Sequence, residues 1–155
     1  MRNEIKAVID TSVFIAAIKS KSSTSSPVKL MKTCHEGFFK IVTSPQILEE
    51  LTRKLIEYTY SDELIAEFIA YITINAITTQ GLCSTNKLDN IDPKDNIILA
   101  AAFESRSDFI VTLDSKHILP LKHCYGTQIV DPNAFVQEIE KYKNCVREPI
   151  QTMIF

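Results

Sequence analysis

The stretch from Ile5 to Phe14 constrains the fold more than any other part of the chain. Its apolar run, Ile-Lys-Ala-Val-Ile, is rich in β-branched residues and stops at Asp10, which two hydroxyl residues follow. Helical spacing then begins at once, at Val13, Phe14, Ala17 and Ile18. A short apolar run that leads directly into a helix is typical of a buried parallel strand. Ligands bind at the carboxyl ends of such strands, so Asp10 is placed for chemistry; alternatively, Asp10, Thr11 or Ser12 caps the helix.

Further acids fall at two similar junctions. Phe109–Leu113 is another short apolar run, and it ends at Asp114. Asp92 and Asp95 stand at the start of the apolar helical segment Ile97–Phe103. Carboxylates that converge repel one another unless a cation lies among them, and hard divalent cations prefer oxygen ligands. Because no pattern of His or Cys ligands accompanies these acids, the sequence favours a magnesium or manganese site.

The length and the composition predict one ordinary globular domain. The chain has 155 residues, 45% of them hydrophobic and 23% charged, with a mean hydropathy of +0.02. We expect one domain over residues 1–142 and a C-terminal tail over 143–155. No apolar stretch reaches the roughly 20 residues of a bilayer helix, and the N-terminus lacks the pattern of a signal peptide. The sequence therefore predicts a cytoplasmic protein without a membrane segment.

Cysteine spacing and net charge exclude fewer classes of protein than length and composition do. The four cysteines, at positions 34, 83, 124 and 145, have no paired spacing, which argues against a zinc site or a disulfide framework and favours reduced thiols. His123 and Cys124 are adjacent, and adjacent side chains in a strand or helix point apart, so they are a poor ligand pair. The formal charge of −2 neither supports nor excludes a nucleic-acid partner.

The remaining segments alternate between helical and extended patterns. Residues 19–27 and 83–91 are polar and are expected to be loops. Further helices are expected over 28–35, over 46–58, from 61–62 onward and over 132–142. Further strands are expected over 40–44 and 127–130, and a short extended piece over 78–82. This alternation predicts an α/β fold, a three-layer α/β/α sandwich with a mainly parallel central sheet.

The predicted helix over 46–58 carries two glutamates that are not equivalent. Its apolar stripe consists of Ile47, Leu48, Leu51, Leu55 and Tyr58. Glu50 lies at the edge of this stripe, about 110° from its centre, whereas Glu49 lies about 150° away and faces solvent. If either glutamate reaches an interior cluster, it is therefore Glu50. The alternative is a solvated Glu50 that pairs with Lys54, four residues further on.

Four short motifs contain the selected acids: Val-Ile-Asp10-Thr-Ser, Ser44-Pro-Gln-Ile-Leu-Glu-Glu50-Leu, Asp92-Pro-Lys-Asp95-Asn and Ile110-Val-Thr-Leu-Asp114. In this order, and over nearly the whole chain, they resemble the PIN domain family. Within that family, the chain is similar to the small prokaryotic VapC-like toxins of toxin–antitoxin pairs.

The resemblance implies a metal-dependent ribonuclease whose acids hold one or two Mg²⁺ or Mn²⁺ ions. It makes Asp10 the central bridging ligand, adds Asp95 and Asp114 to the metal shell, and lets Glu50 bind directly or through water. Such ions polarise the phosphodiester and lower the pKa of an attacking water. Supporting roles are expected for Thr11, Ser12, Asp92, Asn96, Thr112 and Lys116, with Asp92 serving chiefly as the acid of the helix start.

Two positions depart from the family pattern. Ser12 stands where many members carry asparagine, and it can still donate and accept a hydrogen bond. Lys116 stands where some members carry another aspartate. A lysine at this position removes a possible ligand of the second metal but could contact a phosphate. The departure therefore puts the binding of two metal ions in question.

Other acid-bearing classes fit less well. A phosphoacceptor receiver domain needs an early pair of acids, but Glu4 precedes the first strand. A phosphatase with an Asp-x-Asp motif needs an acid where Ser12 stands. A catalytically inactive interaction module and an RNA-processing nuclease that is not a toxin remain as alternatives.

The expected partners follow from the same resemblance. They are RNA, an inhibitory antitoxin protein and a second copy of the chain in a homodimer. Apolar surface on the helix after Ser61, or in the tail, is the candidate contact region. Basic residues near the acid-bearing junctions could steer a phosphate backbone: Lys19, Lys21, Arg53, Lys54, Lys94, Lys116, His117 and Lys122.

Overall fold

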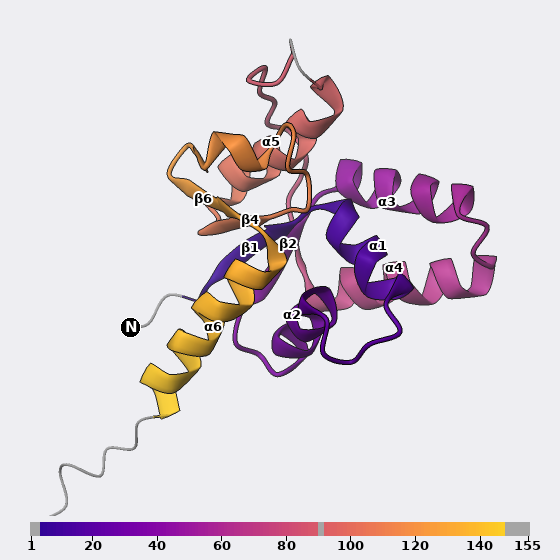
Figure 1. The fold of residues 1–155 in the computed structure, drawn as a ribbon. Helices are drawn as coiled ribbons and strands as arrows, with labels where there is room; N and C mark the ends of the chain where they lie inside the picture. Colours follow the sequence, from indigo (N-terminus) through magenta and orange to yellow (C-terminus); the bar gives the residue numbers. More distant parts are fainter. Residues whose placement is uncertain (1–3, 90–91, 148–155) are drawn as a thin grey trace, which may run out of the picture.

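The computed structural model describes residues 4–89 and 92–147. Six strands form one sheet in the order β3-β2-β1-β4-β6-β5 (Figure 1). They are β1 (Lys6–Ile9), β2 (Lys40–Thr43), β3 (Ile77–Thr78), β4 (Phe109–Val111), β5 (His123–Cys124) and β6 (Thr127–Val130). Only the pair β5–β6 is antiparallel among the strand pairs of these residues. Because β1 and β4 are parallel neighbours, the residues that follow them meet at one edge of the sheet.

Helices cover both faces of this sheet. They are α1 (Thr11–Lys19), α2 (Ser26–His35), α3 (Pro45–Glu57), α4 (Asp62–Asn75), α5 (Asn96–Ser105) and α6 (Pro132–Arg147). In β1, Ala7 and Ile9 pack into the core formed with α1, α2, α4 and α6, whereas Val8 packs toward α5 on the other face. The predicted three-layer α/β sandwich with a mainly parallel sheet is confirmed.

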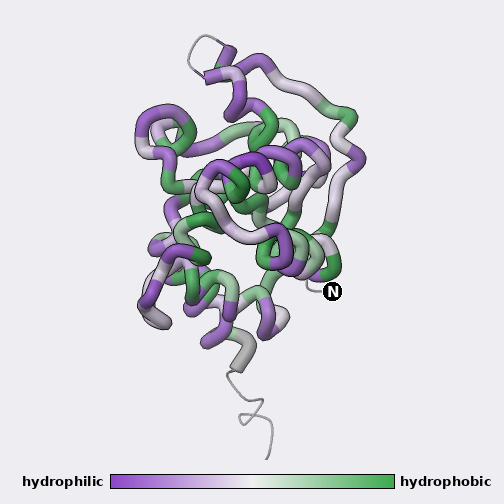
Figure 2. Tube along the Cα trace, turned by 90° about the vertical axis from the view of Figure 1, so that its right-hand side faces the viewer, coloured by the Kyte–Doolittle hydropathy of each residue, from purple (hydrophilic) through white to green (hydrophobic). Residues whose placement is uncertain are grey.

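Local sequence signals explain where two of the helices begin. The Ser44 hydroxyl accepts a hydrogen bond from the N–H of Ile47 at 3.2 Å, and Pro45 occupies the first turn. The Ser61 hydroxyl accepts from the N–H of Leu64 in the same way. Such caps satisfy N–H groups that have no partner inside the helix. In Figure 2, hydrophobic segments run through the middle of the molecule and hydrophilic ones occupy the outer turns.

The strand β5 was not expected from the sequence. It forms a hairpin with β6, in which Cys124 lies opposite Thr127 across the two-residue turn Tyr125-Gly126. Both turn residues have positive φ, 51° and 81°. Such turns favour Asn-Gly or Asp-Gly, so a tyrosine at the first position concealed the hairpin. Within β5, His123 is exposed and Cys124 buried, and the structure contains all four cysteines as free thiols.

Element boundaries differ from the expected ones at several places. The strands β2 and β4 end at Thr43 and Val111, and β3 begins at Ile77, one residue earlier than the extended piece expected over 78–82. The helix α6 continues past the expected end at residue 142 to Arg147. Lys143 stabilises this extension, because it is buried and its Nζ lies 3.5 Å from the carboxylate of Glu36. Residues 143–147 of the expected tail are therefore helical, and 148–155 lie outside the described residues.

None of the helices in the described ranges combines the length and the apolar character needed to cross a bilayer. The division into a domain over 1–142 and a tail stays a prediction.

Candidate metal centre

Asp10 follows β1 at the centre of the sheet and is only 7% exposed. It occupies the position before α1, but its carboxylate accepts no capping hydrogen bond from the first turn. Its Oδ2 accepts instead from the hydroxyls of Thr112 at 2.7 Å and Ser12 at 3.0 Å, and its Oδ1 from that of Thr11 at 3.4 Å. The capping alternative is therefore wrong for Asp10, and three hydroxyls orient its carboxylate.

Thr112 links Asp10 to the acid that follows β4. Its hydroxyl donates to Asp10 and accepts from the N–H of Asp114 at 3.0 Å, and its side chain is fully buried. The Oδ1 of Asp114 accepts in turn from the N–H groups of Lys116 and His117, both at 3.0 Å. These bonds fix one oxygen of Asp114 and leave Oδ2 directed toward the cluster.

Asp95 belongs to the single turn of 3₁₀-helix over Pro93–Asp95 that precedes α5. Its Oδ2 is buried and has no hydrogen-bond partner within the described residues. Burial, the adjoining carboxyl of Asp114 and the negative charges of Asp92 and Asp10 raise the pKa of Asp95 from 3.8 to about 7. The structure thus brings Asp10, Asp95 and Asp114 close enough for their charges to act on one another.

The pKa of Asp114 moves in the opposite direction. Burial raises it, but the N–H of His117, the adjoining carboxyl of Asp95 and the N–H of Lys116 together bring it below 3.8. One acid of the pair therefore holds a proton to higher pH while its neighbour stays ionised, as happens when two carboxylates share a site.

His117 lies among the acids, a position that the sequence did not indicate. Its Nδ1 is 3.5 Å from Asp114 Oδ2, 3.6 Å from Asp95 Oδ2 and 3.8 Å from Asp92 Oδ2. We expected His117 only in a basic rim around the site, and the acids without a histidine near them; that expectation is wrong. The available signal was its position three residues after Asp114, on the same short turn.

Asp92 has two roles in the structure. Its Oδ1 accepts from the N–H of Lys94 at 3.2 Å, which is the expected role of an acid at a helix start. Its other oxygen faces His117. Asp92, Asp95 and His117 each offer one ligand atom, and these three atoms lie within 4.8 Å of one another. Two carboxylates and an imidazole at this separation fit a divalent cation, and the partnerless Oδ2 of Asp95 is the atom best placed to gain from one.

Glu50 is held by basic side chains. Its carboxylate accepts from Arg53 at 2.7 Å and lies 3.7 Å from Lys54 Nζ, and the Arg53 hydrogen bond lowers the pKa of Glu50 against the effect of burial. Lys54 Nζ is in turn 3.4 Å from the hydroxyl of Thr11, which contacts Asp10. The predicted surface pairing of Glu50 with Lys54 is therefore present, and Lys54 stands between Glu50 and the acids.

The remaining predicted supporters differ in what they contact. Ser12 accepts from the N–H of Leu113 at 3.3 Å and so joins α1 to the Asp114 turn. Asn96 is buried and points away from the acids: it accepts from the N–H of Leu88 and donates to Asp89. Lys116 reaches Asp114 through its backbone N–H. Ser12 therefore supports the acid cluster directly, whereas Asn96 fixes the loop before Asp92.

The fold and this cluster define a class: a three-layer α/β protein with carboxylates converging at the carboxyl edge of its parallel strands. A family model described as the PIN domain matches residues 6–116. The chain belongs to the PIN domain family.

One protein is similar to this chain in sequence, and two solved structures are similar to it in fold. The chain is 28% identical to the uncharacterized protein MJ1680 of Methanocaldococcus jannaschii over 90% of this chain and 94% of that one. The structure is similar to that of VapBC-1 from nontypeable Haemophilus influenzae, with a TM-score of 0.60, 15% identity, and coverage of 83% and 99% of the two chains. It is also similar to VapBC2 from Rickettsia felis bound to a DNA fragment from the promoter, with a TM-score of 0.59, 15% identity, and coverage of 82% and 98%.

Proposed function

We propose that the protein is a metal-dependent endoribonuclease that hydrolyses RNA phosphodiester bonds. The observation that carries this proposal is the convergence of Asp10, Asp95 and Asp114, in which a buried carboxylate oxygen of Asp95 lacks a donor among the described residues. Carboxylates that lie close enough to raise one another's pKa favour a divalent cation between them. Membership of the PIN domain family supports nuclease chemistry, because PIN domains are typically nucleases.

Each acid has a proposed role. Asp10, oriented by Thr112 and Ser12, is the central ligand, and Asp95 and Asp114 complete the shell. Glu50 contributes through water from the α3 side, and Lys54, which lies between Glu50 and Thr11, is a proposed phosphate contact. When bound, Mg²⁺ or Mn²⁺ supplies a water of lowered pKa and neutralises charge on the phosphodiester. Thr11 and Lys116 border the same edge, and the ammonium of Lys116 is proposed as a phosphate contact.

His117 bears on the choice of metal. Magnesium demands hard oxygen ligands and retains its waters, whereas manganese accepts carboxylates together with an imidazole. If His117 coordinates the ion through Nδ1, Mn²⁺ supports more activity than Mg²⁺. If His117 contacts only the carboxylates and not the ion, the two ions act alike.

The biological role that we propose is the toxin of a toxin–antitoxin pair. The support is the fold shared with two VapBC proteins. An apolar groove of about 470 Å³ between α1, α2 and α4, lined in part by Ile18, Met31, Phe68 and Tyr71, is the proposed contact for an antitoxin protein or a second copy of the chain. An RNA-processing nuclease without toxicity, and an inactive interaction module, are the competing roles.

Incubation of purified protein with a mixed RNA pool tests the activity directly. Cleavage is expected with Mn²⁺ or Mg²⁺, and it is expected to stop with a chelator and in Asp95→Asn. Cleavage that survives both treatments would overturn the mechanism. If the wild type cleaves no RNA with either ion, the inactive interaction module becomes the favoured role.

Expression in a bacterial host tests the biological role. The wild type is expected to slow growth, and Asp10→Asn, at matched soluble levels, is not. Normal growth with active wild-type enzyme would identify a nuclease that is not a toxin.

A further inference from the structure

Three adjoining cavities follow α5 from the carboxylate edge of the sheet toward the far end of the helix. The first, of about 240 Å³, lies beside Glu50. It shares Gln46 and Ile97 with the second, of about 270 Å³, which shares Cys83 and Glu104 with the third, of about 560 Å³. Since α5 has ten residues, the series follows a helix of about 15 Å. The three cavities adjoin through these shared residues, and we call the series the α5 track.

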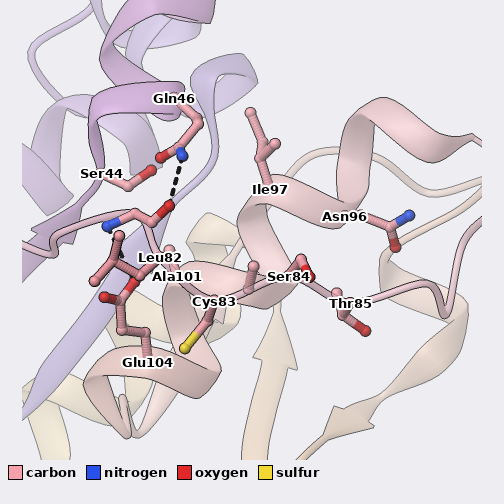
Figure 3. Close-up of a pocket in the computed structure, with 12 residues that line it drawn as sticks. Ser44, Gln46, Leu82, Cys83, Ser84, Thr85, Asn96, Ile97, Ala101 and Glu104 are labelled. Atoms are coloured by element: carbon pink, nitrogen blue, oxygen red, sulfur yellow. Dashed lines mark hydrogen bonds between the residues drawn. The ribbon is translucent and has the colours of Figure 1, made fainter.

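The middle cavity has an apolar wall and a fixed rim (Figure 3). Ile97 and Ala101 of α5 form the wall. On the rim, the side chain of Gln46 donates to the carbonyl of Gly81 at 2.8 Å, and the N–H of Gly81 donates to Glu104 at 3.2 Å. Because these polar groups are already paired, the surface left in the cavity is mainly apolar, and its volume is about nine times the roughly 30 Å³ of one water.

The third cavity contains an exposed aromatic pair with cations beside it. Phe103 and Tyr125 are each 51% exposed, and their ring centroids are 4.9 Å apart. Lys87 Nζ lies 4.9 Å from the centre of the Tyr125 ring, and Arg106 lines the same cavity. The Tyr125 hydroxyl is 3.1 Å from that of Thr85, so the ring is tied to the segment that closes the middle cavity. We call Phe103 and Tyr125 the aromatic platform.

We propose that the α5 track binds single-stranded RNA and that the aromatic platform stacks a base several nucleotides from the scissile phosphate. This inference rests on the proposed ribonuclease function. Single strands are held by aromatic stacking together with cations that contact the phosphates, which is the combination found here. At roughly 3.4 Å per stacked nucleotide, a path of about 15 Å corresponds to about four nucleotides. Lys87 and Arg106 contact phosphates on either side of the stacked base.

The track carries side chains of both charges, and its cations lie at its two ends. Arg53 and Lys94 line the cavity next to the acid cluster, and Lys87 and Arg106 lie at the platform. Four acids also line the track: Glu49 and Glu50 in the first cavity, Glu104 in the second and third, and Asp108 in the third. Three of them are paired, because Glu50 accepts from Arg53, Glu104 from the N–H of Gly81 and Asp108 from the N–H of Lys6. Cations therefore stand at both ends of an apolar middle section, as a strand with phosphates outside and bases inside requires.

Binding by a labelled single-stranded 12-nucleotide RNA tests the platform. The measurement uses the full chain in an Asp10→Asn background with Mn²⁺, so that the RNA is not cut. Phe103→Leu keeps apolar volume but removes the π-face, and it is expected to weaken binding by about 5- to 100-fold. Tyr125→Phe keeps the ring, loses only the contact with Thr85, and is expected to bind like the parent.

Tyr58 provides a matched control elsewhere on the surface. It is 49% exposed and carries Lys19 Nζ 3.4 Å from its ring centre, but it lies at the far end of α3. Tyr58→Leu is expected to leave RNA binding unchanged. An equal loss in Tyr58→Leu and Phe103→Leu, or no loss in Phe103→Leu, would overturn the proposal and leave the aromatic pair as a cover for the β5–β6 hairpin.

Cleavage with the catalytic acids intact separates this inference from the proposed function. A dinucleotide does not reach the platform, so Phe103→Leu should leave its kcat/KM unchanged while lowering that of the 12-nucleotide RNA. If the wild type cleaves RNA but Phe103→Leu affects both substrates alike, the α5 track is wrong and the nuclease stands. If the wild type never cleaves, yet Phe103→Leu weakens binding, the nuclease is wrong and the track is an RNA-binding surface.

Discussion

The two edges of the sheet differ in whether their polar groups have hydrogen-bond partners. At the edge where β1 and β4 begin, the carboxylate of Asp108 accepts from the N–H of Lys6 at 2.9 Å, and the hydroxyl of Thr127 donates to the carbonyl of Ser107 at 2.8 Å. At the edge where the same strands end, acids face other acids, and one oxygen of Asp95 has no donor within the described residues. The polar groups of the first edge are paired within the protein, whereas those of the second gain a partner in the proposed function, where a cation binds among the acids.

This difference distinguishes a structural polar cluster from a functional one. Buried polar groups normally find partners because an unmade hydrogen bond costs free energy. The Asp108 edge follows that rule, so its groups stabilise the fold. The Asp10 edge breaks it, and a site that stores repulsion in the metal-free state gains the most from binding a divalent ion.

The largest expected effect is on catalysis at the carboxylate edge. Asp10→Asn keeps the volume of the side chain and one accepting oxygen for the hydroxyls of Thr112 and Ser12 but removes the charge at the centre of the cluster. We expect RNA cleavage to fall by at least about 100-fold, because loss of a ligand should exceed the 10- to 100-fold cost of losing a residue that only supports one. Initial rates with Mn²⁺ measure this loss. A rate within a few-fold of the wild type would show that the cluster does not do the chemistry.

A pair of matched substitutions compares the two edges directly. Thr112→Val and Thr127→Val each remove one buried hydroxyl and keep the shape of the side chain. Each should lower the free energy of unfolding by about 1 to 3 kcal/mol. Thr112→Val should also lower cleavage by about 10- to 100-fold, because it releases Asp10 and Asp114 from their fixed orientation.

Thr127→Val should leave cleavage unchanged, since its hydroxyl serves only the opposite edge. Denaturant melts and initial rates on both variants give the comparison. Similar losses of activity in Thr112→Val and Thr127→Val would mean that the two edges do not differ in their importance for cleavage.

Glu50→Gln should have an intermediate effect. Its carboxylate is bound by Arg53 and lies near Lys54, so a role through water predicts a loss of about 10-fold, near the lower limit for a residue that supports a ligand. Its effect on stability should stay below about 1 kcal/mol, because exposed ion pairs contribute little. A loss as large as that of Asp10→Asn would instead make Glu50 a direct ligand.

The smallest expected effect is on the stability of the metal-free protein as a function of pH. The pKa of Asp95 is about 7 in the folded state, against 3.8 when the carboxyl is unperturbed. The folded state therefore keeps the Asp95 proton to higher pH than the unfolded state does. The resulting contribution to the free energy of unfolding is complete below pH 4 and is lost as the pH rises through 7. We expect Asp95→Asn to be more stable than the wild type at pH 8 by about 1 kcal/mol, after discounting for solvent at the partly exposed carboxyl.

Thermal melts with a chelator at pH 5 and pH 8 check this sign, and Mn²⁺ should restore the wild type at pH 8 more than Asp95→Asn. A wild type that is more stable at pH 8 than at pH 5 relative to the variant would contradict the repulsion assigned to this edge.

Strong local patterns made much of this architecture readable in advance. The apolar run before Asp10 and the helical spacing of Leu51 and Leu55 predicted elements that the structure contains. The hairpin of β5 and β6 escaped prediction because Tyr125 occupies a turn position where tyrosine is uncommon. The last turn of α6 escaped because it depends on contacts of Lys143 with Glu36, a residue far away in sequence.

By itself, the sequence determined that acids end two neighbouring strands and begin a helix, because the periods of strands and helices are written into the order of apolar residues. Only the tertiary structure decided which of those acids meet, that His117 turns in among them, and that Glu50 turns toward Arg53. The physical reason is that side-chain direction and charge interaction depend on distances across the fold, which a one-dimensional pattern does not contain.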